Sequence, residues 1–147
     1  MDLHLRGKRV LITGASKGIG AAAAESFAEE GCHLHLAARS GDQLKALADR
    51  LRSAHQIDAT AHITDLRKAE DVTRLAREAS DIDILVNNAG DIPGGSIDKI
   101  DEATWRHAWE LKVFGYVNLT RLIYAQMKAR GGGTCGTDPL SRRGRGR

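Results

Sequence analysis

The feature that most constrains the fold is a regular alternation of short apolar runs and amphipathic stretches between residues 8 and 90. The stretches 19–30, 42–54 and 67–79 repeat apolar residues at helical spacing. The runs between them have the length and apolar or β-branched character of strands, and they lie at 8–13, 33–37, 57–63 and 82–86. This alternation predicts a doubly wound α/β fold, with an incomplete parallel sheet of strand order 3-2-1-4 and helices on both faces.

Beyond residue 100 the pattern becomes one long helix, expected over 101–129, and the folded domain is predicted to span 1–130. Residues 131–147 are rich in glycine and arginine and are predicted to be disordered, because they hold few large apolar side chains to offset the entropy of ordering. The strand at 82–86 would then be an open edge of the sheet. The abrupt change in composition also suggests the hypothesis of a shifted reading frame, which translating the other two frames of the coding DNA after Gly133 would test.

A glycine-rich turn, Thr13-Gly-Ala-Ser-Lys-Gly-Ile-Gly20, joins the first strand to the first helix. A helix start offers unpaired backbone N–H groups and the positive end of the helix dipole, which suits a pyrophosphate. Glycine lets the backbone approach the phosphate and lets the helix lie close to the strand. The spacing is G-x-x-x-G-x-G rather than the common G-x-G-x-x-G, and an ordinary strand-to-helix turn remains the alternative.

This turn resembles the cofactor loop of the short-chain dehydrogenase/reductase family, and two further segments of residues 5–133 match that family in order. Asp65-Leu66 follows the third strand, where the family places a carboxylate against the adenine amino group; Asp65 could instead cap the next helix. Asn87-Asn88-Ala89-Gly90 follows the fourth strand and could also be a plain turn. The resemblance implies a Rossmann-type fold and a nicotinamide cofactor held by Gly14, Ser16, Lys17, Gly18, Ile19, Gly20, Arg39, Asp65, Leu66, Asn87, Asn88, Ala89 and Gly90.

The residues at the end of the second predicted strand indicate which nicotinamide cofactor, NAD(H) or NADP(H), the chain binds. An acidic residue there accepts hydrogen bonds from the ribose hydroxyls, whereas a basic residue favours a 2′-phosphate. Here Ala38-Arg39-Ser40 offers no carboxylate, and the resemblance places Arg39 and Lys17 near that phosphate. NADP(H) is therefore predicted over NAD(H), the alternative being that both side chains are solvated surface cations.

Members of this family use a serine, a Tyr-x-x-x-Lys pair and a helix asparagine to transfer a proton to or from a carbonyl or alcohol oxygen. Tyr124 and Lys128 have that spacing, but they fall in the long helix, before the strand that the motif should follow. Lys112 stands where asparagine is usual, and Asn118 lies on another face of the helix. No catalytic residue is therefore predicted. The resemblance implies an oxidoreductase fragment inactive alone; a non-catalytic NADP(H)-binding module is the alternative, and self-association through 101–129 is expected.

Charge and the cysteine and histidine content bear on nucleic-acid binding, metal binding and cellular location. The net charge of +3 comes from residues 130–147, whose five arginines and one aspartate contribute +4, so the other residues sum to −1 (3 − 4). Nucleic-acid binding would rest on that tail alone and is not favoured. Cys32 and Cys135 are predicted to be free thiols in the cytoplasm, the histidines lack metal-ligand spacing, and no apolar run is long enough to span a membrane.

Overall fold

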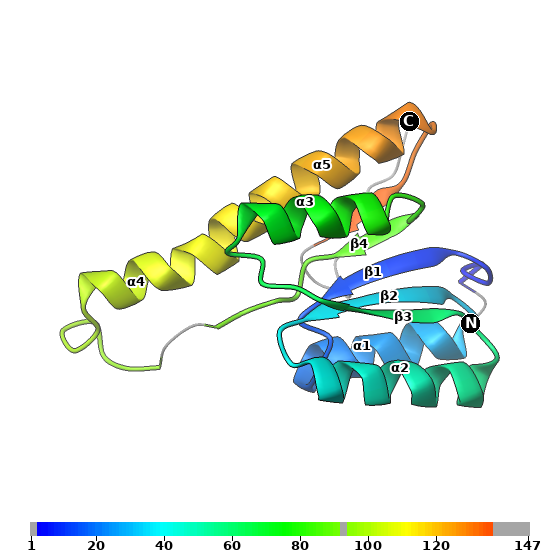
Figure 1. Ribbon diagram of the computed structural model, residues 1–147, viewed down its shortest axis with the longest axis horizontal. Helices are drawn as coiled ribbons and strands as arrows, with labels where there is room; N and C mark the ends of the chain where they lie inside the picture. The colour runs from blue at the N-terminus through cyan, green and yellow to red at the C-terminus, as the bar shows by residue number, and fades with distance from the viewer. Residues whose placement is uncertain (1–2, 92–93, 137–147) are drawn as a thin grey trace.

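A computed structural model describes residues 3–91 and 94–136 as a parallel five-stranded sheet with helices on both faces (Figure 1). The strand order is β3-β2-β1-β4-β5. In chain order the elements are β1 (Arg9–Thr13), α1 (Gly18–Glu29), β2 (His33–Ala38), α2 (Gly41–His55), β3 (Ala59–Ile63), α3 (Ala69–Glu78), β4 (Ile84–Val86), α4 (Glu102–Trp109), the π-helix η1 (Glu110–Gly115), α5 (Tyr116–Ala129) and β5 (Thr134–Gly136).

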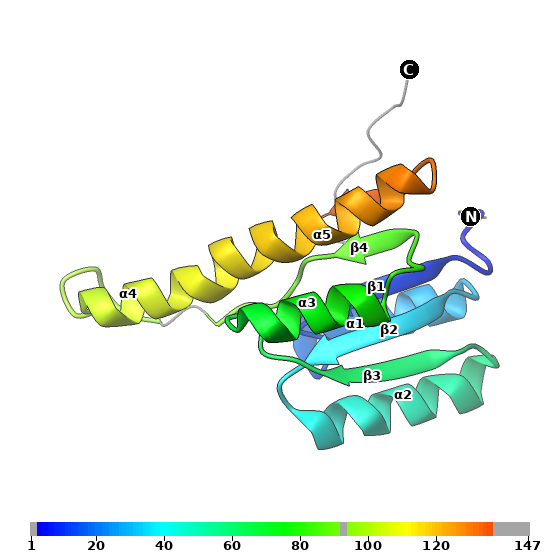
Figure 2. The ribbon, with the colours of Figure 1, turned by 45° about the horizontal axis from the view of Figure 1, so that its top comes forward.

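The predicted doubly wound fold and the 3-2-1-4 order of the first four strands are confirmed, and most element boundaries agree within two residues. β1 lies at the centre of the sheet, where its continuous apolar run Val10, Leu11 and Ile12 is fully buried, as suits a strand covered on both faces. Helices α1 and α2 cover one face, and α3 and α5 cover the other (Figures 1 and 2).

The C-terminal edge differs from the sequence prediction. Thr134–Gly136 forms β5, which pairs with β4 in register Ile84↔Thr134 and Val86↔Gly136, so disorder is the wrong prediction for these three residues. β4 is consequently not an open edge. The physical reason is that a ladder needs only backbone donors and acceptors, so a segment poor in apolar side chains can still pair. The rest of the predicted tail, 137–147, lies outside the described residues.

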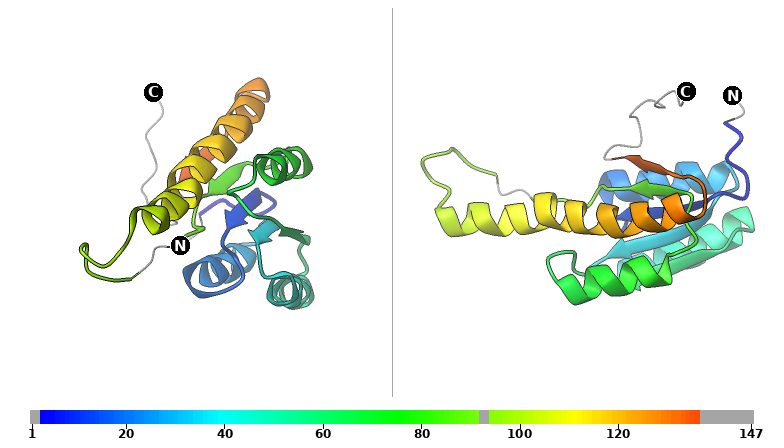
Figure 3. Two further views of the ribbon diagram at one scale, coloured as in Figure 1. Left: turned by 60° about the vertical axis from the view of Figure 1, so that its left-hand side comes forward. Right: turned by 90° about the horizontal axis from the view of Figure 1, so that it is seen from above.

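The long C-terminal helix is continuous but not uniformly α-helical. It changes at η1, a π-helical turn between α4 and α5. The α4 end projects beyond the sheet, whereas α5 packs beside α3 (Figure 3). Ile123 is buried against the sheet, whereas the exposed large side chains of this helix are Trp105, Trp109, Phe114, Val117 and Tyr124. No helix in the described ranges has both the length and the apolar composition needed to cross a bilayer.

Candidate functional site

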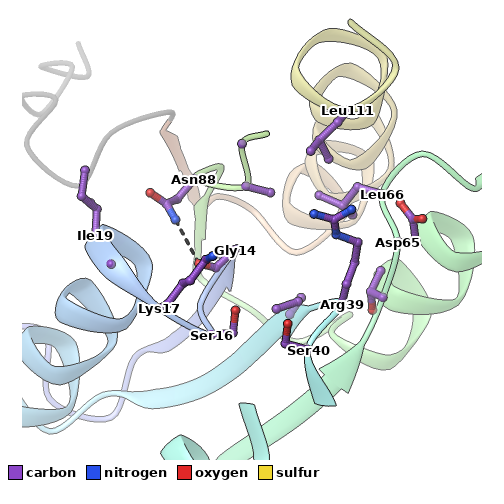
Figure 4. Close-up of a pocket in the computed structure, with 16 residues that line it drawn as sticks. Gly14, Ser16, Lys17, Ile19, Arg39, Ser40, Asp65, Leu66, Asn88 and Leu111 are labelled. Carbon is purple, nitrogen blue, oxygen red and sulfur yellow. Dashed lines mark hydrogen bonds between the residues drawn. The ribbon is translucent and has the colours of Figure 1, made fainter. Parts of the chain in front are cut away.

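The carboxyl ends of β1, β2, β3 and β4 meet at one edge of the sheet, around an open cavity of about 350 Å³ (Figure 4). Ligands of open α/β sheets bind at this edge, where the connections diverge to opposite faces. The cavity brings together all the predicted cofactor residues except Gly20 and Asn87. It is also lined by Ala37, Ala38, Ser40, Thr64 and Leu111, which were not predicted.

The glycine turn forms one wall of the cavity. Helix α1 begins at Gly18, and its N-terminus has no side-chain cap and no acidic residue in the first turn, so its positive end can face an anion. Gly14 has φ +68, and a Cβ there would lie 2.8 Å from the Cα of Ala89. Ile19, one of the predicted cofactor residues, is 70% exposed and lines the cavity.

Gly20 and Asn87 support the cavity without lining it. A Cβ on Gly20 would overlap the carbonyl oxygen of Gly14 and the side-chain amide of Asn88, so glycine is required for close packing. The buried Asn87 points away from the cavity, and its Nδ2 donates to Thr120 Oγ1 at 2.9 Å. Both residues therefore hold the site's elements together.

The Asn-Asn-Ala-Gly segment is tied directly to the glycine turn. Asn88 Nδ2 donates to the carbonyl oxygens of Thr13 and Gly14, at 3.1 and 3.3 Å. The backbone amides of Asn88 and Ala89 donate to Thr13 Oγ1, at 3.0 and 3.1 Å. Thr13 is thus a positioning residue that sequence reasoning missed, although its place at the end of β1 beside the glycine turn was the signal available.

Asp65 is held as a carboxylate at the opposite side of the cavity. It accepts hydrogen bonds from the Arg67 side chain, at 2.7 Å from Nη2 and 2.8 Å from Nε, and from the Arg67 backbone amide at 3.1 Å. These bonds from Arg67, with a smaller contribution from the charge of Arg39, lower the pKa of Asp65 to about 2. Asp65 is not the helix cap, because α3 begins later with Lys68 at the N-cap.

Arg39 and Lys17 are exposed cations at the cavity rim. Arg39 reaches from the end of β2 toward Leu66, on the side of the cavity where Asp65 lies (Figure 4), and its Nη2 forms an ion pair with Asp91 at 3.1 Å. Lys17 lies on the glycine turn. Positive charge therefore flanks the cavity from two different elements.

The Tyr124-x-x-x-Lys128 string lies away from this cavity. Tyr124 is 59% exposed, and both residues line a separate hollow with Met127 and Cys135 near the end of α5. Asn118 is exposed and does not line the cavity. In the part of the chain that the structure describes, no cluster of three or more potential ligands could hold a metal ion.

The family model for short chain dehydrogenases matches residues 8–135. The chain belongs to the short-chain dehydrogenase family. It is 36% identical over 120 residues to an 11-beta-hydroxysteroid dehydrogenase of Sesamum indicum, an alignment covering 78% of this chain and 34% of that enzyme.

Two solved members of the short-chain dehydrogenase family share this fold. L-sorbose reductase from Gluconobacter frateurii, solved with NADPH and L-sorbose, superposes with a TM-score of 0.86 at 37% identity over 92% of this chain and 53% of that one. A 7α-hydroxysteroid dehydrogenase solved with NADH and 7-oxo glycochenodeoxycholic acid gives 0.84 at 33% identity over 91% and 53%. The chain thus spans about half the length of these solved relatives.

Proposed function

We propose that this chain binds NADP(H) and forms the cofactor half of an oxidoreductase that moves a hydride between the nicotinamide and a carbonyl or alcohol. The carrying observation is the cavity at the carboxyl ends of four strands, with an uncapped helix N-terminus on one wall and cations at its rim. When bound, the dinucleotide supplies or accepts the hydride. The residues of this chain hold its phosphates, ribose and adenine.

The residues present fit such a group. A Cβ on Gly14 or Gly20 would overlap atoms of the turn after β4 or of the glycine turn itself, so glycine lets these segments pack closely. The uncapped start of α1 at Gly18 leaves backbone N–H groups open to a pyrophosphate. The carboxylate of Asp65, kept ionised by Arg67, can accept a hydrogen bond from the adenine amino group. The dinucleotide would then lie across the cavity, with its adenosine half toward β2 and β3.

The preference for NADP(H) over NAD(H) rests on charge at the end of β2. Relatives have been solved with NADPH and with NADH, so family membership leaves the choice open. The cavity rim here carries Arg39 and Lys17, which can neutralise a 2′-phosphate. Arg39 Nη2 also pairs with Asp91 at 3.1 Å, so a bound 2′-phosphate would share this guanidinium with Asp91.

Calorimetric titration of the chain with NADPH and with NADH tests this preference. Arg39→Asp should weaken NADPH binding by about 10- to 100-fold, the loss of one charge-assisted contact, and should affect NADH far less. Arg77→Asp is the matched control, because Arg77 is exposed on α3 and does not line the cavity. Equal effects of Arg39→Asp on both cofactors would show that Arg39 does not read the 2′-phosphate.

We infer that the chain alone binds the cofactor without turnover. No tyrosine lines the cavity within the described residues, and the Tyr124–Lys128 pair lies elsewhere. A non-catalytic NADP(H)-binding module is the second candidate, supported by the same observation. Measurable NADPH oxidation with a panel of carbonyl compounds would contradict both.

Self-association is proposed through the exposed face of the long helix. Trp105, Trp109, Phe114 and Val117 are all at least 38% exposed, and a hollow lies between the side chains of Trp105, Trp109 and Phe114. Exposed aromatic side chains grouped on one helix are typical of an interface.

The two cysteines are free, Cys32 buried and Cys135 exposed. Burial raises the pKa of the Cys32 thiol to about 11, so it stays protonated and unreactive. Free thiols are usual in reducing compartments, and they support the proposal of a cytoplasmic location.

A further inference from the structure

Lys112 extends from the π-helix η1 toward the turn that follows β4. Its Nζ donates to the Tyr116 hydroxyl at 3.3 Å and lies 5.1 Å from the centroid of the Tyr116 ring. A Cβ built on Gly90, the last residue of the Asn-Asn-Ala-Gly segment, would be 3.7 Å from this nitrogen. The Lys112 ammonium therefore lies beside a residue that lines the cavity.

Tyr116 fixes where that ammonium sits. The Tyr116 side chain is buried, and its hydroxyl donates to the carbonyl oxygen of Ala89. Burial raises the pKa of Tyr116 to about 12, so the phenol remains protonated and its oxygen can accept from Lys112. Sequence reasoning treated Lys112 only as a replacement for asparagine and missed its partner, although residues four apart on a helix share a face.

The helix that carries this pair is held close to the cavity. Gly115 approaches the loop after β3, where a Cβ would lie 2.9 Å from the Leu66 carbonyl oxygen. Leu111, next to Lys112, lies on the same helix over the cavity (Figure 4) and lines it. Lys112 is thus placed by packing on both sides of it.

The sheet order shows which half of a dinucleotide would lie nearest to Lys112. A doubly wound sheet binds the two nucleotides on opposite sides of the switch point. Arg39 and Asp65, after β2 and β3, mark the adenosine side under the proposed function. Gly90 follows β4, so the side with Lys112 takes the nicotinamide nucleotide.

The charge of Lys112 is not compensated by an ion pair. Among residues 3–91 and 94–136, no carboxylate forms an ion pair with the Lys112 Nζ. Asp91, next to Gly90, pairs with Arg39 instead. The oxidised nicotinamide ring carries a positive charge, whereas the reduced ring is neutral. Like charges repel, so a cation at this place disfavours the oxidised form.

We propose that Lys112 makes this site select NADPH over NADP⁺. The inference rests on the proposed function and concerns the redox form of the cofactor rather than its 2′-phosphate. Because Lys112 is solvent-exposed, the expected contribution is about 2- to 10-fold in the ratio of the two dissociation constants, and it should shrink as salt is added. Both cofactors carry the 2′-phosphate, so contacts with Arg39 cancel in this ratio.

Calorimetric titration of the full chain with NADPH and with NADP⁺ tests the proposal at low and at high salt. Lys112→Met should lower the ratio Kd(NADP⁺)/Kd(NADPH) by about 2- to 10-fold, and Lys112→Arg should retain it. Lys128→Met is the matched control, since it removes the same charge from the far end of the helix and should leave the ratio unchanged.

The outcomes distinguish a failure of the role of Lys112 from a failure of the proposed function. Binding of both forms with a ratio that Lys112→Met leaves unchanged would overturn the role of Lys112 and leave the proposed function standing. A ratio that falls equally with Lys128→Met would also overturn it, because the effect would then be one of net charge. If the unsubstituted chain bound neither form, the proposed function and this inference would both fail.

Discussion

Replacing Gly20 by alanine tests whether close packing between α1 and the turn after β4 holds the site together. A Cβ on Gly20 would overlap Gly14 O and Asn88 Nδ2, and it would lie 2.9 Å from the carbonyl carbon of Gly14, whereas real Cβ atoms keep at least 3.0 Å. One obstacle is backbone. The other is an amide that already donates to Thr13 O and Gly14 O, so neither can move without losing a contact.

The expected cost follows from that geometry. Overpacking by a methyl group costs about 1–3 kcal/mol, and two constrained neighbours place Gly20→Ala near the upper end. For a domain of this size that corresponds to a fall in Tm of about 6–12 °C. NADPH affinity should fall as well, because the start of α1 is displaced from the glycine turn.

Gly18→Ala is the matched control two residues away. Gly18 has φ +59, and a Cβ there would have no atom within 4 Å, so alanine meets only backbone strain of about 1–2 kcal/mol. Thermal unfolding followed by circular dichroism, with urea titration, compares the two. Asn88→Ala combined with Gly20→Ala should cost less than the sum of the single changes, because one obstacle is already absent. A smaller loss for Gly20→Ala than for Gly18→Ala, or strict additivity of the pair, would refute the packing argument.

Two further predictions concern other parts of the molecule. His35 is largely buried, its Nδ1 lies 2.9 Å from His62 Nε2, and burial followed by the neighbouring His62 lowers its pKa. The unfolded chain therefore binds a proton more readily than the folded chain, so the free energy of unfolding should fall as pH drops below about 6.5. Urea unfolding at about pH 7.5 and 5.5 measures this fall, which should be smaller in His35→Leu than in the unsubstituted chain. An equal fall in both proteins would exclude His35 as its source. If the exposed face of α4 is an interface, Trp109→Glu should shift the chain toward monomer in analytical ultracentrifugation, whereas Glu70→Gln on α3 should not. An unchanged distribution of oligomeric states in Trp109→Glu would show that this face is not the interface.

Periodicity and local chemistry were enough to predict the first four strands and the edge where the site lies. Alternation of apolar runs and amphipathic stretches determines a parallel sheet almost by itself, because each element must bury its apolar face against the next. The turn residues follow strands in the sequence, and parallel strands end at one edge. With the resemblance to the short-chain dehydrogenase/reductase family, which implied roles for Asp65 and Asn88, the grouping of Gly14, Arg39, Asp65 and Asn88 could therefore be predicted without coordinates.

Other features were decided only by the tertiary structure. The residues of β5 have no strand-like side-chain pattern, and they pair because β4 offers unsatisfied backbone donors and acceptors. The place of Lys112 beside Gly90 depends on the π-helical turn and on the approach of Gly115 to Leu66. Sequence spacing specifies the order of elements along the chain, whereas these contacts depend on how closely the elements approach in space.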